Sequence, residues 1–360
     1  MSDAAPAVNS WNEWDPLREV IVGSVRGAAD MGFEPAFSPY FRKDDPARAF
    51  RGGRVPEALV AEAERQIDGL ADLLQRQGIA VRRPDPIDQN VAMTTPDWQV
   101  QNGRAIACPR DVLLVIGDEI IEAPMAQRGR YFEFRAYRSL LKEYFHGGAR
   151  WTTAPKPLMS DDLYDDHAPF DMNERPLLTE FEPVFDAACF ARFGRDIFWQ
   201  PDLVSNAFGA AWLARHLGPT FRIHRIAFRE PTPTHIDTTL VPIRPGLALT
   251  NPQRPCIDGS LDIFRANDWQ LVDAPPSVRS GKAPSREVSN WISMNILMLD
   301  PHTAVVEQAE TPIVDLLKSL GCEVISCAFD RVYPFGGGLH CCTGDIRRDG
   351  GCESYFPSLD

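Results

Sequence analysis

The sequence lacks long hydrophobic runs and any excess of basic residues. No segment resembles the apolar span of about 18 residues that a transmembrane helix needs. Lys and Arg number 37 against 50 Asp and Glu, which gives a formal net charge of -13. A nucleic-acid partner would require a dense face of Lys and Arg to displace counterions. We therefore expect neither a membrane nor a nucleic acid as partner, whereas a small basic substrate is compatible with this charge.

The eight cysteines lack CxxC spacing. This absence argues against a zinc knuckle and a disulfide framework, so we expect most of these thiols to be reduced and buried. The stretch from Met1 to Asn9 also lacks the basic and apolar regions of a signal peptide. A cytoplasmic location is the corresponding prediction.

The residues that are present have an ordinary globular composition and a recurring junction. Hydrophobic residues make up 44% of the chain and charged residues 24%, enough for a sizeable core. At each junction an amphipathic helical pattern ends at Gly or Asn and a β-rich run follows directly. Five junctions occur, at 56–77 with 79–81, 140–147 with 151–153, 212–218 with 221–223, 261–267 with 269–272, and 311–321 with 322–325.

Pairs of short β-like runs lie between these junctions and are joined by turn residues. Examples are 112–116 with 119–122, and 240–243 with 247–250. Hairpin, helix and strand thus form a repeating unit. Five units with little residue-level similarity favour a closed pseudo-fivefold α/β assembly in one domain, residues 1–360. A generic mixed α/β domain is the alternative that the pattern leaves open.

Cys341 is the first candidate for a catalytic residue because it follows the glycine run Gly336 to Gly338. Glycines let the backbone approach a ligand closely and adopt positive φ. A plain turn is the alternative interpretation, and Cys342 is a rival nucleophile. In an extended segment Cys341 and Cys342 would point to opposite faces. The side chain of His340 would then point away from the Cys341 thiol, so a base must come from elsewhere.

His235 has the most suggestive surroundings of the seven histidines. It stands two residues before Asp237 at the expected start of a strand, so both side chains would lie on one face. A carboxylate beside a histidine adjusts its tautomer and pKa, as general acid–base catalysis requires. A paired structural histidine is the alternative.

Two carboxylates stand in apolar contexts. Asp186 follows Pro183-Val184-Phe185, and Asp111 precedes Val112-Leu113-Leu114. Because an ionised group is costly to bury without a cationic partner, both are candidates to bind a cation. Asp111 could instead pair with Arg110 or cap a turn, and Asp186 could serve a loop.

At these residues the sequence closely resembles the arginine:glycine amidinotransferase family and its relatives from antibiotic and cyanotoxin biosynthesis. The resemblance covers nearly the whole chain in ordered blocks. These blocks are 12–17, 19–23, 81–84, 109–111, 120–125, 154–157, 185–188, 194–196, 235–237, 251–252 and 336–348.

The resemblance implies the five-bladed α/β propeller of the guanidine-modifying superfamily, the pentein fold, in agreement with the five junctions. It also implies that Cys341 rather than Cys342 is the nucleophile. His235 corresponds to the acid and base of the family, and Asp186 to the carboxylate that orients and polarises the site. The residues implied to contact the substrate are Asp111, Asp237, Arg254 and Ser289.

The chemistry implied is transfer of the amidino group of L-arginine to an amine, through an amidino-cysteine intermediate and ping-pong kinetics. Carboxylates would hold the planar guanidinium while a thiolate attacks its central carbon. The resemblance implies no metal, no organic cofactor and a homodimer. An arginine hydrolase of the deiminase type and a non-catalytic arginine-binding protein are the alternatives.

The amine acceptor is the point at which the sequence departs from the family. Glycine-using members typically have Asn-Pro-Met-His where this chain has Thr232-Pro233-Thr234-His235. Thr232 and Thr234, at the expected edge of the acceptor pocket, favour a roomier or more polar site. Glycine remains the leading acceptor, giving guanidinoacetate and ornithine. Lysine, 4-aminobutyrate or a specialised biosynthetic amine are the alternatives.

Overall fold

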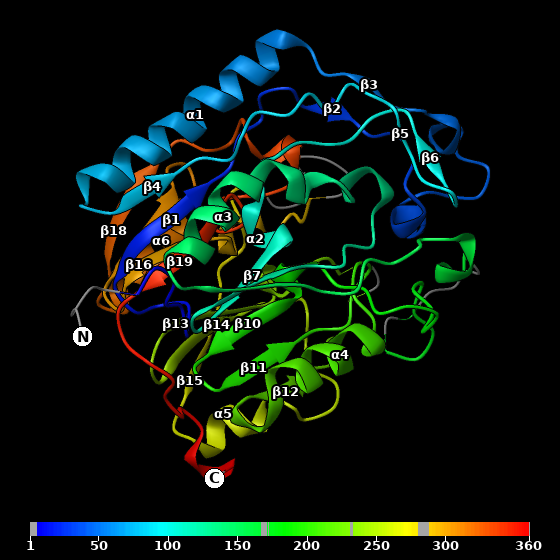
Figure 1. Cartoon of the computed structure of the whole chain (residues 1–360). Helices are drawn as coiled ribbons and strands as arrows, with labels where there is room; N and C mark the ends of the chain where they lie inside the picture. Colours follow the sequence, from blue (N-terminus) through cyan, green and yellow to red (C-terminus); the bar gives the residue numbers. More distant parts are fainter. Residues whose placement is uncertain (1–5, 167–170, 172, 231–232, 280–287, 360) are drawn as a thin grey trace.

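The fold contains five three-stranded sheets that share one strand pattern. The computed structural model describes residues 6–166, 171, 173–230, 233–279 and 288–359 (Figure 1). In each sheet one edge strand pairs antiparallel with the middle strand and the other pairs parallel with it. The strand orders are β19 (Thr343–Arg348), β1 (Leu17–Val22), β4 (Ala80–Arg82); β7 (Leu113–Ile116), β8 (Glu119–Glu122), β9 (Arg150–Thr153); β10 (Phe190–Phe193), β11 (Asp196–Trp199), β12 (Arg222–Arg225); β13 (Leu240–Arg244), β14 (Leu247–Thr250), β15 (Gln270–Asp273); and β16 (Leu297–Asp300), β17 (Thr303–Glu307), β18 (Glu323–Cys327).

A helix lies between the middle strand and the parallel edge strand of every sheet. Parallel pairing requires such a crossover, because the chain must return to the starting end of the sheet. All five helix-to-strand junctions expected from the sequence are confirmed. The helices are α1 (Glu57–Arg76), α3 (Arg138–His146), α4 (Ala207–Leu217), α5 (Asp262–Ala266) and α6 (Thr311–Ser319).

Burial decreases from the antiparallel hairpin towards the parallel edge strand. Every residue of β7, β8, β10 and β11 is buried, whereas β4, β9, β12 and β15 contain no fully buried residue. The hairpins therefore form the interior of the molecule and the parallel strands its periphery. Residues just before a hairpin are consequently placed in the interior.

A strand near each end of the described chain takes part in the same sheet. β1 pairs with β19, with Val20 opposite Asp345 and Val22 opposite Thr343. The last strand of the chain thus completes the first sheet (Figure 1). Because β19 begins two residues after Cys341, this pairing fixes the position of the candidate nucleophile. Among the described residues, no helix is both long and apolar enough to span a membrane.

Candidate active site

In each sheet, the short segment that precedes the antiparallel edge strand contributes to the candidate site. Contacts join these segments: α2 lies against η6 and β19, η6 against η8, and η8 against η9. The five segments are α2 (Pro109–Val112), η6 (Ala187–Cys189), η8 (Ile236–Thr238), η9 (Ile292–Met294) and the turn 339–342 before β19. Asp111, Asp186, His235, Asp237 and Cys341, all expected from the sequence, lie on or beside these segments.

Cys341 lies in a turn, not in an extended segment. The N–H of Cys342 donates to the Gly338 carbonyl at 3.0 Å. The expectation that alternating faces separate His340 from Cys341 is therefore wrong. A Cβ atom at Gly337 would lie 2.4 Å from the Cβ atom of Cys341, so this turn requires glycine there. Cys341 is 3% exposed and Cys342 is fully buried in the core.

Asn295 holds the nucleophile with both ends of its amide. Its Oδ1 accepts the backbone N–H groups of His340 at 3.0 Å and Cys341 at 3.1 Å. Its Nδ2 lies 3.1 Å from the Cys341 sulfur and donates to Asp237 Oδ2 at 2.7 Å. The Cys341 thiol donates to the same Asp237 oxygen at 3.3 Å. Asn295 thus fixes the thiol and supplies a donor that can stabilise a thiolate.

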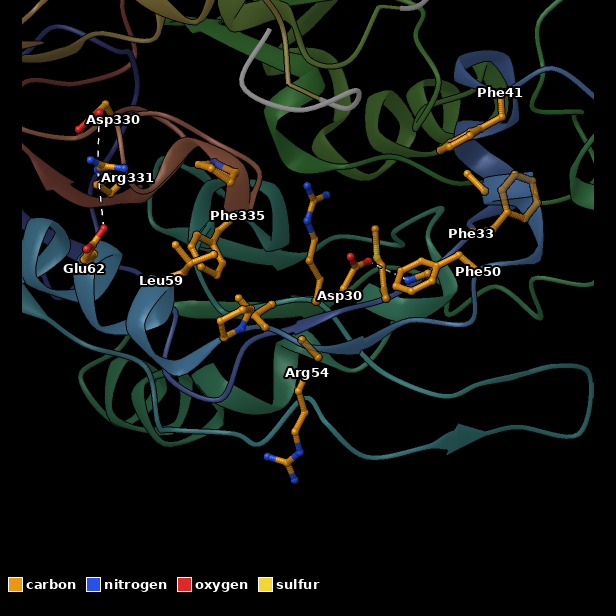
Figure 2. Close-up of a pocket in the computed structure, with 18 of the residues that line it drawn as sticks. Asp30, Phe33, Phe41, Phe50, Arg54, Leu59, Glu62, Asp330, Arg331 and Phe335 are labelled. Carbon is orange, nitrogen blue, oxygen red and sulfur yellow. Dashed lines mark hydrogen bonds and ion pairs between the residues drawn. The ribbon is translucent and has the colours of Figure 1, made fainter. Parts of the chain in front are cut away.

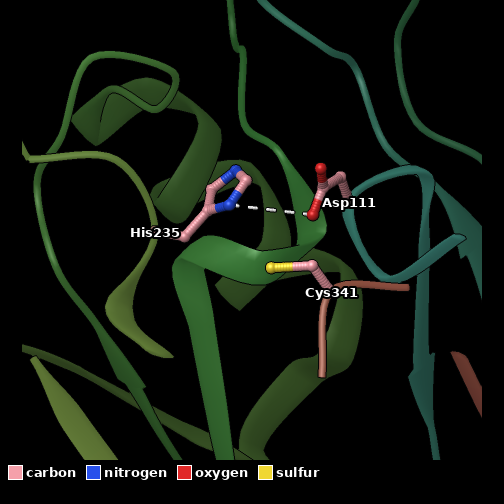
Figure 3. Close-up of side chains that lie close together, drawn as sticks. All are labelled: Asp111, His235 and Cys341. Atoms are coloured by element: carbon pink, nitrogen blue, oxygen red, sulfur yellow. Dashed lines mark ion pairs between the residues drawn. The ribbon is translucent and has the colours of Figure 1, made fainter. Parts of the chain in front are cut away.

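His235 contacts the carboxylates of Asp186 and Asp111, and Figure 3 shows the second of these contacts. Its Nε2 lies 3.1 Å from Asp186 Oδ2, and its Nδ1 lies 3.7 Å from Asp111 Oδ1. The expected strand start is absent, because His235 has a φ of 63° and the short helix η8 follows it. Asp202 accepts the backbone N–H of His235 at 2.9 Å, which stabilises this uncommon conformation. The strained backbone aims the ring at the two carboxylates.

The charges around the site favour an imidazolium at His235 and a neutral thiol at Cys341. Burial opposes a charge on His235, but Asp111 and Asp186 outweigh it and raise the pKa of His235 to about 10. Burial, Asp237 and Asp111 together raise the pKa of the Cys341 thiol well above its usual range. His235 is therefore ready to donate a proton, whereas Cys341 needs an added positive charge before it ionises.

Asp111 and Asp186 can each accept further hydrogen bonds from a cationic ligand. Arg130 donates to Asp111 Oδ2 at 2.8 Å and lies 3.5 Å from Asp186 Oδ2, while Glu133 holds the same guanidinium at 2.9 Å. Asp111 Oδ1 and Asp186 Oδ1 are buried and have no hydrogen-bond donor within the described part of the chain. Unsatisfied buried carboxylate oxygens are costly, so these two atoms mark where a cationic ligand would be stabilised.

Arg254 and Ser289 form a separate polar group beside η8. Arg254 donates to Ser289 Oγ at 3.0 Å and to Glu230 at 2.8 Å. It also donates to the hydroxyls of Thr238 at 2.7 Å and Thr239 at 2.9 Å. Because Thr238 follows Asp237 directly, this guanidinium is anchored to the segment that carries a site carboxylate.

Thr234, expected at the edge of the acceptor pocket, is half-buried next to His235. Its hydroxyl lies 3.1 Å from the hydroxyl of Tyr40, at the end of η1 (Pro35–Tyr40). Thr232 lies outside the described residues. The segment around η1 therefore borders the position that departs from the family pattern.

Sequence reasoning missed Asn295, Arg130 and Asp202. Asn295 lies just before β16. Arg130 and Asp202 lie outside any pattern that marks a site. Arg130 contacts both Asp111 and Asp186, and Asp202 binds the backbone of His235. Only spatial proximity identifies their contribution.

Three potential metal ligands meet at the site. One ligand atom each from Asp111, His235 and Cys341 lie within 4.8 Å of one another, and all three residues are buried. Oxygen, nitrogen and sulfur donors at this spacing suit Zn²⁺. The same atoms face the place for a cationic ligand, so a bound metal would compete with that ligand.

A cavity of about 670 Å³ lies beside the site but is not lined by the candidate catalytic residues. Phe33, Phe41 and Phe50 border one side of it, and Leu59 and Phe335 border another (Figure 2). Phe335 immediately precedes the glycine run that leads to Cys341. The cavity thus adjoins the nucleophile's segment, while the catalytic groups themselves are enclosed.

Comparison with known proteins identifies the family. The glycine amidinotransferase of Gallus gallus, described as mitochondrial, is 45% identical across 97% of this chain and 85% of that protein. The L-arginine:L-lysine amidinotransferase of Pseudomonas savastanoi pv. phaseolicola is 44% identical across 97% of this chain and 96% of that protein. The chain belongs to the amidinotransferase family. As a member of this family it is an enzyme that transfers amidino groups. No protein-family model matches the chain.

Solved structures of amidinotransferases have the same fold. The saxitoxin-pathway amidinotransferase SxtG of Microseira wollei is 45% identical, with a TM-score of 0.88 over 97% of this chain and 100% of that one. The inosamine-phosphate amidinotransferase of Streptomyces griseus is 40% identical, with a TM-score of 0.89 over 98% and 100%. The N-terminal domain of ArgZ shares the fold alone, at 12% identity and a TM-score of 0.61 over 92% of this chain and 98% of that one. The amidinotransferase fold is thus mixed α/β and common to several arginine-modifying enzymes.

Proposed function

We propose that this amidinotransferase moves the amidino group of L-arginine to a primary amine through a covalent intermediate on Cys341. The observation that carries the proposal is the pair of unsatisfied carboxylate oxygens, Asp111 Oδ1 and Asp186 Oδ1, beside a buried thiol and imidazole. A guanidinium offers planar donors and a positive charge that match these oxygens. Its central carbon would then lie within reach of the Cys341 sulfur.

In the first half-reaction, the arginine cation lowers the cost of ionising Cys341. The thiol releases its proton to solvent, and the thiolate takes a proton back from solvent when the product has left. The sulfur attacks the guanidinium carbon, forming a C–S bond. The bond between that carbon and the side-chain nitrogen of arginine then breaks. His235 donates its proton to this nitrogen, and ornithine leaves with the bonding electron pair. An amidino group remains on Cys341.

In the second half-reaction, a neutral acceptor amine takes the place of ornithine. Its nitrogen attacks the amidino carbon and loses a proton to His235, while the C–S bond breaks and the thiolate returns. Asp111, Asp186 and Asp237 stabilise the cationic amidino group throughout. Arg254 and Ser289 are proposed to receive the carboxylate of arginine.

Glycine is the leading acceptor, with guanidinoacetate as the product. The relatives named for glycine and for lysine are about equally similar, at 45% and 44% identity, so identity alone does not separate the two amines. Thr232 and Thr234 keep lysine, 4-aminobutyrate and a specialised biosynthetic amine as alternatives. The hydrogen bond between the hydroxyls of Thr234 and Tyr40 supports a polar rim to the acceptor pocket.

An acceptor screen tests this proposal. Arginine labelled in the guanidino carbon is incubated with the enzyme and one amine at a time, and labelled guanidino product and ornithine are measured. We expect ornithine release that depends on the amine, and an amidino adduct on Cys341 by mass spectrometry when no amine is added. Steady release of citrulline and ammonia from arginine alone would indicate a hydrolase, and absence of any adduct at saturating arginine would indicate a binding protein. Cys341→Ala is the matched variant, expected to fold but to form no adduct.

We also propose that the five sheets are the blades of a closed five-bladed propeller, in a single domain. The completion of the first sheet by the last strand supports closure. So do the contacts of β7 with β19, of β10 with β13 and of β1 with β16, which join different sheets. A cytoplasmic location and a homodimer remain predictions; light scattering of the purified enzyme tests the dimer.

A further inference from the structure

Arg130 lies between the two carboxylates that are proposed to bind the substrate guanidinium. Its Nη1 donates to Asp111 Oδ2 at 2.8 Å and lies 3.5 Å from Asp186 Oδ2. Asp111 lies on α2, which leads into β7, whereas Asp186 directly precedes η6, which leads into β10. One nitrogen atom of Arg130 therefore links carboxylates from two different sheets.

The position of Arg130 is set locally by Glu133, three residues further along the chain. Arg130 Nε donates to Glu133 Oε1 and Nη2 donates to Glu133 Oε2, each at 2.9 Å. Arg130 is 4% exposed and Glu133 is 1% exposed. Two parallel hydrogen bonds fix the plane of a guanidinium as well as its position. Because Glu133 holds two of the three nitrogens, the direction of the third, Nη1, is fixed before it meets the site carboxylates.

The contact with Arg130 selects which oxygen of each carboxylate remains for a ligand. Arg130 approaches the Oδ2 atoms of Asp111 and Asp186, and Asp186 Oδ2 also lies 3.1 Å from His235 Nε2. The Oδ1 atoms of both carboxylates are buried and have no hydrogen-bond donor among the described residues. A carboxylate that is bound through one oxygen to a fixed donor has little freedom to rotate. The two unsatisfied oxygens are therefore held in fixed places.

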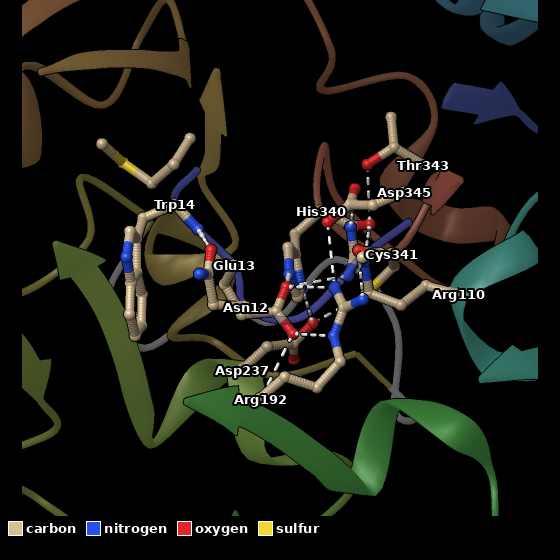
Figure 4. Close-up of polar contacts among 12 residues, drawn as sticks. Asn12, Glu13, Trp14, Arg110, Arg192, Asp237, His340, Cys341, Thr343 and Asp345 are labelled. Atoms are coloured by element: carbon tan, nitrogen blue, oxygen red, sulfur yellow. Dashed lines mark hydrogen bonds and ion pairs between the residues drawn. The ribbon is translucent and has the colours of Figure 1, made fainter. Parts of the chain in front are cut away.

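Arg110 and Arg192 are also buried, but their hydrogen bonds form a closed set (Figure 4). Arg110 donates to Glu13 at 3.0 Å and to Asp345 at 2.6 Å. Arg192 donates to Glu13 at 2.7 Å and 2.9 Å, and to Asp345 at 2.9 Å. Both acids in this set accept from both arginines, which is the arrangement expected of buried ion pairs that support a core. Arg130 differs, because each site carboxylate that it contacts keeps an unsatisfied oxygen.

We propose that Arg130 is a positioning residue for the first half-reaction: it occupies the Oδ2 atoms of Asp111 and Asp186, so that their Oδ1 atoms align the substrate guanidinium with the Cys341 sulfur. The assignment of Cys341 as the attacking group comes from the proposed function, and this inference rests on it. Arg130 acts through the two carboxylates and does not touch the reacting atoms. Its loss should therefore slow the attack more than it weakens substrate binding.

Arg130→Lys tests this role, because lysine keeps the positive charge but lacks the planar fork that binds Glu133 and Asp111 together. The variant is mixed with arginine alone, and the amidino adduct on Cys341 is followed by quenched-flow mass spectrometry over a range of arginine concentrations. We expect the maximal rate of adduct formation to fall by about a hundredfold, as for a misplaced reacting group. The arginine concentration that gives half this rate should change by less than about threefold, since both Oδ1 atoms remain.

Glu133→Gln is a second variant, which leaves Arg130 and both site carboxylates in place. The glutamine side chain has one acceptor oxygen, so it can no longer bind the guanidinium through two oxygens. We expect the maximal rate to fall by about tenfold, again with little change in the half-saturating arginine concentration. This variant decides the question if Arg130→Lys does not fold.

Arg222→Lys is the matched control. Arg222 binds buried Asp196 through the same fork, at 2.7 Å and 2.8 Å, but it lies on β12 at the periphery. Its replacement should leave both quantities at their wild-type values, and an equal loss of rate in this control would mean that any broken fork loosens the enzyme.

Two results for the site variants would overturn the role of Arg130. The first is a wild-type maximal rate in folded Arg130→Lys or Glu133→Gln. The second is a loss of rate that saturating arginine restores, since Arg130 would then serve binding alone. Absence of any adduct in the wild-type enzyme would instead refute the proposed function, and this inference with it.

Discussion

Replacing Asp111 with asparagine should make the Cys341 thiol more acidic and yet abolish most amidino transfer. Asp111 is one of the groups that raise the pKa of Cys341, so loss of its charge favours the thiolate. The same carboxylate has an oxygen without a hydrogen-bond donor, which we propose binds the guanidinium of arginine. Asp111→Asn therefore separates two roles of this carboxylate, because it should favour the Cys341 thiolate but weaken binding of the substrate guanidinium.

The geometry sets the size of the effect on the thiol. The nearest ligand atoms of Asp111 and Cys341 lie within 4.8 Å of each other. With an effective dielectric constant of about 20, two unit charges at this distance interact by about 3.5 kcal/mol, equivalent to about 2.5 pKa units. Arg130, which is 2.8 Å from Asp111, offsets part of this field. We therefore expect the thiol pKa to fall by about one unit.

Alkylation of Cys341 by iodoacetamide, followed against pH, measures this shift, and ornithine release measures transfer. Transfer should fall by about a hundredfold or more, as for loss of a positioning charge in an active site. Asp97→Asn, at an exposed position, is the control for loss of one carboxylate. An alkylation profile of Asp111→Asn that is unchanged or moves to higher pH would refute the electrostatic account of the site.

Three further changes and one ligand test other parts of the structure. Gly338→Ala should cut turnover by about tenfold or more without unfolding, because the new Cβ would lie 2.6 Å from Asn295 Oδ1; wild-type kcat would contradict this. Leu141→Ala, at a fully buried position in α3, should lower the free energy of unfolding by about 2–4 kcal/mol in urea titrations, and a loss below about 1 kcal/mol would argue against that packing. The pKa of His235 is raised from 6.5 to about 10 in the folded protein. The stabilisation that its charge gives the folded state is therefore complete below pH 6.5 and is lost as the pH rises towards 10. His235→Gln should flatten the decline in melting temperature over this range, and an unaltered decline would show that other groups cause it. Zn²⁺ should inhibit amidino transfer in competition with arginine, and a chelator should reverse the inhibition. Activity that is insensitive to millimolar Zn²⁺ would mean that Asp111, His235 and Cys341 cannot bind one ion together.

The repeating unit of the fold could be predicted from the sequence because its signals are local. Each of the five helices carries its apolar periodicity and its Gly or Asn stop within a single segment, and the strand follows at once. The hairpins at 113–122 and 240–250 are similarly marked by turn residues between apolar runs. The order in which sheets adjoin one another leaves no comparable local mark, since it depends on contacts between distant segments.

The catalytic candidates were recognisable from the sequence, but their geometry was not. The extended conformation assumed for 340–342 is replaced by a turn, and that assumed for 235–237 is replaced by the short helix η8. Both segments are stabilised from elsewhere in the chain: Asn295 binds the backbone of His340 and Cys341, and Asp202 binds that of His235. Local propensity cannot predict a conformation that such long-range hydrogen bonds select.

The sequence by itself therefore determined the repeating α/β unit and the amidinotransferase family, and it indicated the candidate thiol, imidazole and carboxylates. The tertiary structure alone decided that segments from all five sheets meet at one point, and that Arg130 contacts both Asp111 and Asp186. The physical reason is that charge and burial act through space. The ionisation of Cys341 and His235 depends on carboxylates that lie far away in the chain but within a few ångströms in the fold.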